Sequence, residues 1–177
     1  KMVNERESTE GLNHSKLLSV YIEEIFSESD ISFESVNAIA VSKGPGSYTG
    51  LRIGVSLAKG LCYALDKPLI SVGTLDALGI YTSDNIDLYT GETGYGNNIL
   101  LCPMIDARRM EVYTSLYNRK GERIENVSAM VIERNSFASF LEDNKILFFG
   151  NGAAKSESVI IHPNALFCGP VQNSARF

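Results

Sequence analysis

The run from Gly44 to Gly50 holds the residue types in this chain best suited to binding chemistry. Glycines and hydroxyl side chains ahead of a helix leave backbone amides free to bind an anion such as phosphate. The P-loop motif fails here because its second glycine would fall on Thr49 or Leu51, and the dinucleotide fingerprint fails because it also requires a glycine at Thr49. Helix capping by Ser47 or Thr49 explains the same residue types, so we favour a capping turn over a phosphate site. This glycine-rich turn comprises Gly44, Pro45, Gly46, Ser47, Tyr48, Thr49 and Gly50.

Few side chains offer acid–base or metal chemistry. His14 and His162 are the only histidines and lie nearly a whole chain apart, which gives no metal pair or nucleophile–base pair. The three cysteines are widely spaced in apolar stretches and form no C-x-x-C motif, so we expect free, buried thiols. The sequence therefore predicts no catalytic residues and no metal site.

A polar motif at the predicted lobe boundary mixes both charges between two strand candidates. Its charged members are Asp106, Arg108, Arg109 and Glu111. Such a motif is either a polar site between two lobes or a salt-bridged turn. We favour the turn, because exposed turns of mixed charge are common.

The helix expected from Gly50 to Asp66 carries a narrow polar stripe. Steps of four, three, four and three residues align the stripe members Arg52, Ser56, Lys59, Tyr63 and Asp66. The remaining residues from Leu51 to Leu65 are apolar or glycine. A helix with so narrow a polar stripe is covered on more than one side.

The preceding helix, expected from Ser15 to Phe26, has a similarly broad apolar arc. The two helices could form one face that docks helices of another chain, or other parts of this chain could cover them; the residues alone leave both alternatives open. On the first alternative, the partner-binding residues are Leu17, Leu18, Tyr21, Ile22, Ile25, Arg52, Ile53, Leu57 and Leu61.

Alternating strand and helix signals predict an α/β protein with two lobes. In the first lobe, residues 1–83, strands at 36–41 and 68–72 flank the long helix, and a short helix follows at 74–78. Residues 84–98 are rich in Gly, Asn and Thr and indicate a flexible loop or linker. In the second lobe, 99–177, we expect strands at 99–105, 111–117, 129–132 and 146–149, a short helix capped by Ser136, and no further structure in the tail apart from the start of a helix that is cut short.

Composition limits the partners and the compartment. The net charge of −5 and the pI near 5.1 argue against a surface that grips nucleic acid by itself, so any role near tRNA should be indirect. No apolar run reaches the roughly 18 residues of a membrane span, and the first residues do not resemble a secretory leader. We therefore expect a cytoplasmic protein without membrane contact.

Four motifs together resemble the TsaB family, also called YeaZ. They are His14-Ser15-x-x-Leu18, Gly44 to Gly54, Ala58-Lys59-Gly60-Leu61, and Asp106-Ala107-Arg108-Arg109-x-Glu111-Val112-Tyr113. Their order and spacing also match those of the family, and the resemblance covers essentially the whole chain. The glycine-rich run is highly specific for this family. The resemblance implies the two-lobed actin-like, or ribonuclease H-like, fold of the actin-like ATPase superfamily.

The same resemblance implies a function. TsaB-type proteins are non-catalytic scaffolds that bind and activate the catalytic subunit TsaD, with the ATPase TsaE joining, to form threonylcarbamoyladenosine beside the anticodon of tRNAs reading ANN codons. The resemblance also assigns the two apolar helices to binding TsaD or, in its absence, a second copy. No cofactor would be bound firmly by this chain; ATP or ADP would lie only at the interface with the partner.

The chain departs from the family pattern in three places. Where the catalytic relative has a metal-binding histidine pair, residues 72–78 contain no histidine. Three first-lobe strands that precede the first helix in family members would be absent, and the final helix would be truncated. The alternative functions are an actin-like nucleotide-binding ATPase, an inactive metallopeptidase-like homodimer, or a direct tRNA-binding module.

Overall fold

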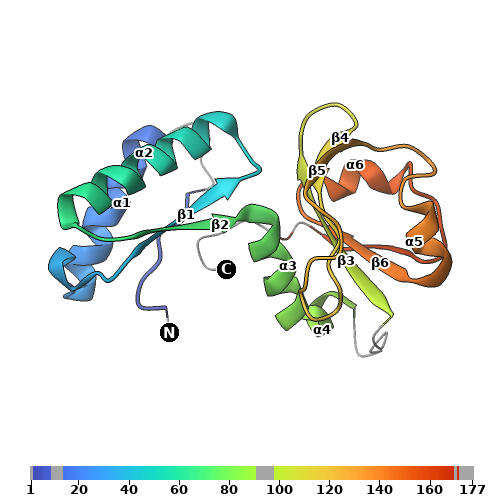
Figure 1. The fold of residues 1–177 in the computed structure, drawn as a ribbon, viewed down its shortest axis with the longest axis horizontal. Coiled ribbons are helices and arrows are strands. Elements are labelled where there is room, and N and C mark those ends of the chain that lie inside the picture. The colour runs from blue at the N-terminus through green and yellow to red at the C-terminus, as the bar shows by residue number, and fades with distance from the viewer. Residues whose placement is uncertain (1, 9–13, 91–97, 170, 172–177) are drawn as a thin grey trace. The chain divides into compact units, whose positions relative to one another are not determined.

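The computed structural model describes residues 2–8, 14–90, 98–169 and 171. The chain divides into two compact units, a first unit of Lys1–Gly73 and a second unit of Thr74–Asn173 (Figure 1). Each unit holds its own sheet with helices beside it, as an actin-like α/β fold requires. The two units are described separately below.

The first unit follows the strand–helix–strand order that the sequence predicts. Its elements are α1 (His14–Ser29), the 3-10 helix η1 (Phe33–Ser35), β1 (Ile39–Gly44), α2 (Tyr48–Leu65) and β2 (Leu69–Gly73). Strands β1 and β2 are parallel, with Ile39 opposite Leu69, and α2 connects them and packs on β1. Gly54 lies on the packed side of α2, because a Cβ there would stand 3.7 Å from a methyl group of Val41.

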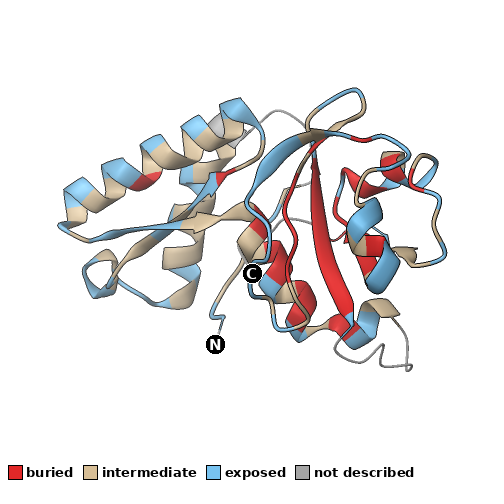
Figure 2. Cartoon of the chain, turned by 45° about the vertical axis from the view of Figure 1, so that its right-hand side comes forward, coloured by how far each residue is buried: buried red, intermediate tan, exposed pale blue. Residues whose placement is uncertain are grey.

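Burial is sparse in the first unit. Among its described residues only Gly44 and Ala58 are buried, and Figure 2 shows α1, α2 and both strands almost entirely in the colours of intermediate and exposed residues. The segment before α1 is held by ion pairs from Arg6 to Glu24 and Glu28 on the surface of that helix. The described part of this unit therefore contains apolar side chains without enclosing a dry core.

The second unit is built on a five-stranded sheet. Its elements are α3 (Thr74–Asp84), α4 (Ile86–Thr90), β3 (Ile99–Asp106), β4 (Glu111–Thr114), β5 (Ser128–Val131), α5 (Ala138–Asp143), β6 (Lys145–Phe149), α6 (Ala153–Glu157) and β7 (Ala165–Phe167). The strand order is β5-β4-β3-β6-β7, in which β3, β4 and β5 are antiparallel neighbours and β3, β6 and β7 run parallel.

Strand β3 organises the core of the second unit. Cys102 and Met104 belong to one hydrophobic cluster, whereas Leu101 and Ile105 belong to another. Because side chains alternate across a strand, the two clusters lie on opposite faces of the sheet. Burial on both faces explains why residues 99–105 form a continuous apolar run (Figure 2).

The structure differs from the sequence-based expectations around the second unit. Helix α3 groups with the second unit, not the first, because its buried residues Leu75 and Leu78 pack in the same cluster as β3. Residues 86–90 of the expected loop or linker form α4, and residues 91–97 lie outside the described residues. The prediction of an unstructured tail is wrong, because α6 and β7 form there; the truncated helix expected at 173–177 lies outside the described residues.

One predicted cap is also wrong. Helix α5 begins after Phe137, which adopts a left-handed conformation with φ of 64° and provides no side-chain cap. The hydroxyl of Ser136 instead accepts a hydrogen bond from the amide of Glu133 at 2.9 Å. The serine therefore stabilises the turn before the helix, which is an equally local use of the same hydroxyl.

Candidate functional site

A shallow groove runs between α1 and α2 of the first unit. It has a volume of about 450 Å³ and is lined by Leu18, Ser19, Arg52, Ile53, Ser56 and Leu57. Four of these residues, Leu18, Arg52, Ile53 and Leu57, belong to the partner-binding set predicted from the sequence. The structure thus brings residues from both predicted helices to one surface.

Helix α2 leaves apolar surface uncovered around this groove. The predicted stripe is exposed along its length, and Tyr63 within it is 92% exposed. The predicted contact residues Ile53, Leu57 and Leu61 are only half-buried, although they are apolar. Helix α2 is thus covered on two sides, by β1 and by α1, as expected, but its apolar side chains beside the groove stay only half-buried.

The predicted partner-binding residues of α1 are likewise only partly covered. Leu17, Leu18, Tyr21, Ile22 and Ile25 are all half-buried, and Val20 beside them is 44% exposed. The half-buried apolar side chains of these two contacting helices form an apolar surface. Removing such a surface from water costs little free energy of desolvation. This face can bind an apolar surface of complementary shape.

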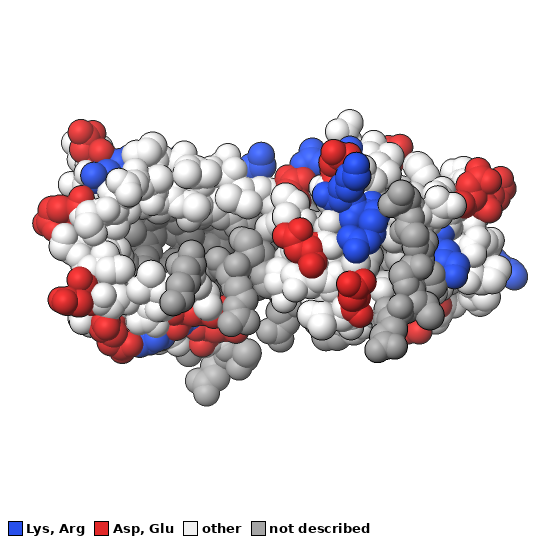
Figure 3. Space-filling model, turned by 90° about the horizontal axis from the view of Figure 1, so that it is seen from below, with Lys and Arg blue, Asp and Glu red and all other residues white. Residues whose placement is uncertain are grey.

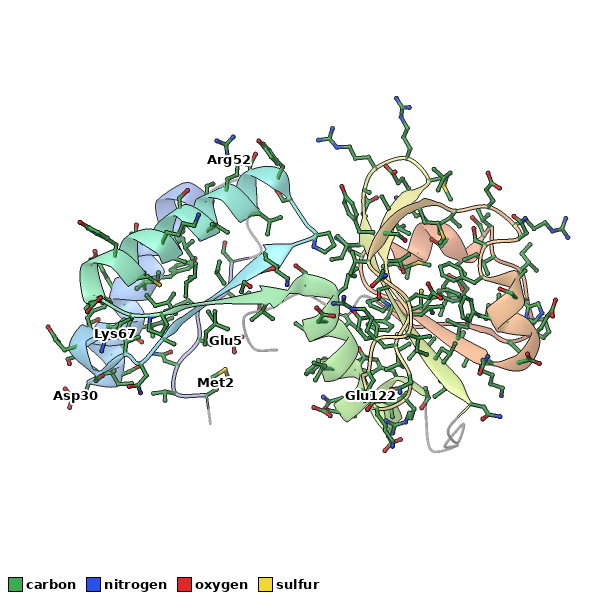
Figure 4. The ribbon with its side chains drawn as sticks, viewed as in Figure 1. Met2, Glu5, Asp30, Arg52, Lys67 and Glu122 are labelled. Carbon is green, nitrogen blue, oxygen red and sulfur yellow. The ribbon has the colours of Figure 1, made fainter. Side chains whose placement is uncertain are left out.

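Arg52 supplies a charge at the rim of the groove. Its Nη1 donates a hydrogen bond to the Tyr48 hydroxyl at 3.2 Å, and its guanidinium lies 5.3 Å from the centre of the Tyr48 ring. Figure 4 shows Arg52 near the beginning of α2, with its side chain directed away from β1. The cation–π contact orients the guanidinium outward, where it can pair with an acidic group.

The glycine-rich turn before α2 is a helix cap in the structure. The hydroxyl of Ser47 accepts a hydrogen bond from the amide of Gly50 at 3.3 Å, whereas Thr49 lies inside the helix. Gly44 has a φ of +96°, and a Cβ on it would stand 3.0 Å from the Leu51 side chain. The turn therefore uses glycine for backbone conformation and serine for capping, as the favoured interpretation of the sequence has it.

The polar motif of Asp106, Arg108, Arg109 and Glu111 joins β3 to β4 as a turn. Its ion pair is formed by Asp106 with Lys155 of α6, a residue that sequence reasoning missed. The hydrogen bond from Lys155 is the main cause that lowers the pKa of Asp106. Arg108 and Arg109 are exposed, and Glu111 is half-buried. No local pattern marks Lys155, because it lies 49 residues from Asp106 in the chain.

Residues 72–78, where the catalytic relative has a histidine pair, hold packing and hydrogen-bonding side chains in this chain. Leu78 is buried in the core of the second unit. Asp76 accepts hydrogen bonds from the Tyr117 hydroxyl at 2.8 Å and from Arg123 Nε at 3.1 Å. Within the described residues there is no group of three His, Cys, Asp or Glu side chains suited to a metal ion. His162 accepts the amide hydrogen of Asn164 at Nδ1.

The cysteines are free thiols. Burial raises the pKa of Cys102 to about 12 and that of Cys168 to about 11. Both therefore stay protonated at neutral pH, and a protonated thiol is a poor nucleophile and metal ligand. Cys102 is buried as expected, whereas Cys62 and Cys168 are only half-buried, so the expectation of buried thiols is wrong for those two.

Charges of both signs lie side by side on the visible face of the second unit, where Figure 3 shows blue and red groups interleaved. Interleaved charges give a weaker field than a single-sign patch of the kind that binds a phosphate backbone. Among the described helices, none has the length and apolar content needed to cross a bilayer.

Comparison with known families gives one consistent group. The family model for TsaD, tRNA N6-adenosine threonylcarbamoyltransferase, matches residues 9–165. The TsaB threonylcarbamoyladenosine biosynthesis protein of Bacillus subtilis is 34% identical over 154 residues, which are 84% of this chain and 61% of that relative. The TsaB protein of Haemophilus influenzae is 31% identical over 172 residues, or 87% of this chain and 69% of that relative. The chain thus spans less than two thirds of the Bacillus relative.

Solved structures agree in fold. YeaZ from Pseudomonas aeruginosa superimposes with a TM-score of 0.63 at 26% identity, over 86% of this chain and 68% of that one. A second Pseudomonas aeruginosa structure, described as similar to peptidase YeaZ, gives a TM-score of 0.71 at 24% identity, over 90% and 70%. By contrast, a threonylcarbamoyltransferase of Clostridium kluyveri is 41% identical over only 63 residues, 36% of this chain and 18% of that protein.

Proposed function

The chain belongs to the TsaB (YeaZ) family, and on this premise we propose that it is a non-catalytic scaffold that binds and activates TsaD in tRNA threonylcarbamoyladenosine formation. The modified nucleoside would lie next to the anticodon of tRNAs reading ANN codons. TsaB relatives match most of this chain, whereas the transferase relative named above matches about a third of it. Coverage by the curated relatives therefore favours a TsaB-type role, while the TsaD family model itself also matches residues 9–165.

The incompletely covered face of α1 and α2 carries the proposal. Leu18, Ile53 and Leu57 line a groove that the described residues of the first unit leave open. Burying such a groove against apolar side chains gains free energy in proportion to the area removed from water. We therefore assign this face to TsaD and, when TsaD is absent, to a second copy of the chain.

The site chemistry favours a scaffold over an enzyme. Leu78 occupies a core position in the segment where the catalytic relative is expected to hold metal through histidines, and leucine offers no metal ligand. The glycine-rich turn serves as a helix cap, and we place any ATP or ADP of the complex at the interface with the partner. TsaE would join this assembly in the cytoplasm, and tRNA contact by this chain would be indirect.

Complex formation with TsaD is the decisive test. The full-length protein would be titrated into TsaD by calorimetry, and the oligomeric state followed by light scattering. Substituting Leu57→Glu or Ile22→Glu places a charge on the apolar face, which we expect to weaken binding at least about a hundredfold. The matched control is Val131→Glu, because Val131 is an apolar residue of the second unit that is already 59% exposed.

Each result has a clear meaning. Loss of binding in the two α1 and α2 variants, with normal binding by the control and unchanged circular dichroism, would support the proposal. Equal binding by all three variants would place the interface elsewhere. Rapid ATP turnover by the isolated chain would instead favour the actin-like ATPase, and tight, salt-sensitive tRNA binding would favour a direct tRNA-binding module.

A further inference from the structure

The turn between β3 and β4 has an unusual backbone. Arg108 and Arg109 both have positive φ, at 73° and 46°, in a region that disfavours side chains other than glycine and asparagine. Two consecutive arginines in this conformation persist only when the surroundings hold the turn in place. The turn itself provides two backbone hydrogen bonds, from Ala107 to Glu111 and from Glu111 to Arg108, at 3.1 and 3.0 Å.

Lys155, a residue of α6, holds the turn through hydrogen bonds to its backbone and to Asp106. Its ammonium donates hydrogen bonds to the carbonyl oxygens of Arg109 at 2.8 Å and Glu111 at 2.7 Å, and to the Asp106 carboxylate. The carbonyl oxygen of Arg108 lies further away at 3.5 Å. An ammonium has three donors, and here all three are used by groups that converge on one point. Asp106 also accepts the amide hydrogen of Arg108 at 2.9 Å, which ties the same carboxylate to the turn.

The helix that carries Lys155 is fixed against the end of β3. Gly152 donates to the carbonyl of Met104 at 3.0 Å, and the Asn151 side chain accepts the Asp106 amide at 3.0 Å. Gly150 allows this approach, because a Cβ on it would stand 2.5 Å from the Met104 oxygen. Lys155 therefore reaches the turn from a rigid base.

Turning the carbonyl groups inward leaves the two arginine side chains on the outside. Arg108 and Arg109 are exposed, and within the described part of the chain neither forms an ion pair. The charge of Lys155, in contrast, is neutralised by Asp106. On a protein of net charge −5, this turn presents a local pair of cations suited to acidic side chains of a protein partner.

We propose that Lys155 is a positioning residue that holds the Asp106–Glu111 turn so that Arg108 and Arg109 meet carboxylates of the partner protein. This inference rests on the proposed scaffold function. It assigns to Lys155 an effect on partner binding that acts only through the two arginines, so removing both arginines should remove the effect of Lys155 as well.

A double-mutant cycle with TsaD tests this coupling. Calorimetric titrations would compare wild type, Lys155→Met, the Arg108→Ala/Arg109→Ala pair, and the triple variant. We expect Lys155→Met and the arginine pair each to weaken binding about tenfold, and the triple variant to bind no more weakly than the pair. Lys120→Met is the matched control, because Lys120 is an exposed lysine of the same unit and the charge change is the same. It should bind within about twofold of wild type.

Hydrogen exchange supplies the conformational readout. In Lys155→Met the amides of Ala107 and Glu111 should exchange faster, while those of β3 stay protected and show that the unit is folded. Should Lys155→Met fail to fold, Asp106→Asn removes the carboxylate charge from the same ammonium and should change exchange and binding in the same direction. Faster exchange with wild-type affinity for TsaD, or effects that add fully in the triple variant, would overturn the positioning role.

Failure of the scaffold function would be recognised separately. If the wild-type chain does not bind TsaD at all, the proposed function is wrong, and inorganic phosphate then serves as the probe. Saturable shifts of the Arg108 and Arg109 Nε signals in wild type that are lost in Lys155→Met would support positioning. Equal shifts in both proteins, or no shift in either, would overturn it.

Discussion

The ring of Tyr117 lies directly against Gly79, so closely that a Cβ atom on Gly79 would stand 3.0 Å from Tyr117 Cγ. Tyr117 is only 1% exposed, and its hydroxyl is anchored on Asp76, so the ring has little freedom to move aside. The contact fixes α3 against the segment that follows β4. It makes glycine a packing requirement at position 79.

Gly79→Ala should therefore destabilise the protein although alanine is the better helix former. We expect a loss of about 1–3 kcal/mol in the free energy of unfolding, the range found for overpacked cores. Urea denaturation followed by circular dichroism measures it. The control is Gly60→Ala in α2, where a Cβ would meet nothing within 4 Å. That variant should gain about 0.5–1 kcal/mol, and equal effects at both sites would contradict the packing argument.

Asp76→Ala should remove a polar anchor from the second unit. The carboxylate accepts hydrogen bonds from Tyr117 and Arg123, whose donors would lose this partner. We expect a loss of about 1–2 kcal/mol, because part of this cluster remains solvated. Asp87→Ala serves as the comparison, since Asp87 is also in the first turn of a helix but is exposed. A similar loss of stability at both positions would show that the carboxylate acts only through the helix dipole.

Ser47→Ala tests the cap of α2. The variant loses the hydrogen bond from the Gly50 amide to the serine hydroxyl, which should cost about 0.5–2 kcal/mol. Thr49→Ala is the control, because Thr49 is exposed and lies within the helix. Thermal unfolding of both variants gives the comparison, and a larger loss in Thr49→Ala would refute capping by Ser47.

Stability should fall as the pH rises through the alkaline range. The pKa of Cys102 is raised from 9.0 to about 12, and those of Tyr89 and Tyr117 from 10.0 to about 12. Burial is the first cause in each case. A group whose pKa is raised in the folded state binds its proton more tightly there, so the folded state is favoured below the unfolded pKa and loses this advantage as the pH approaches the folded value.

The expected window follows from these pKa values. Urea midpoints should stay level up to about pH 9 and then decrease steadily towards pH 12. A Tyr117→Phe variant should lose less stability than wild type between about pH 10 and 12, because it has no phenol to ionise at that position. A flat profile above pH 9 would contradict the raised pKa values. Thiol labelling of Cys102 in the folded protein should likewise be slow at neutral pH.

Residue patterns alone predicted the elements that depend on local interactions. Helical spacing of apolar residues located α1 and α2, and the serine ahead of α2 indicated its cap, because capping and amphipathicity involve neighbours within a few positions. The motif Gly44 to Gly54, taken together with three other motifs, indicated the family. The exposed stripe from Arg52 to Asp66 was also predictable, since it needs only the helical period.

Only the tertiary structure decided which distant residues meet. The pairing of Lys155 with Asp106 joins positions 49 residues apart, and no local pattern encodes such a contact. The assignment of α3 to the second unit depended on the packing of Leu75 and Leu78 against β3, which a helical period alone cannot direct. Helix propensity and spacing set which side of an element is apolar; the shape of the surfaces available for burial decides what that side packs against.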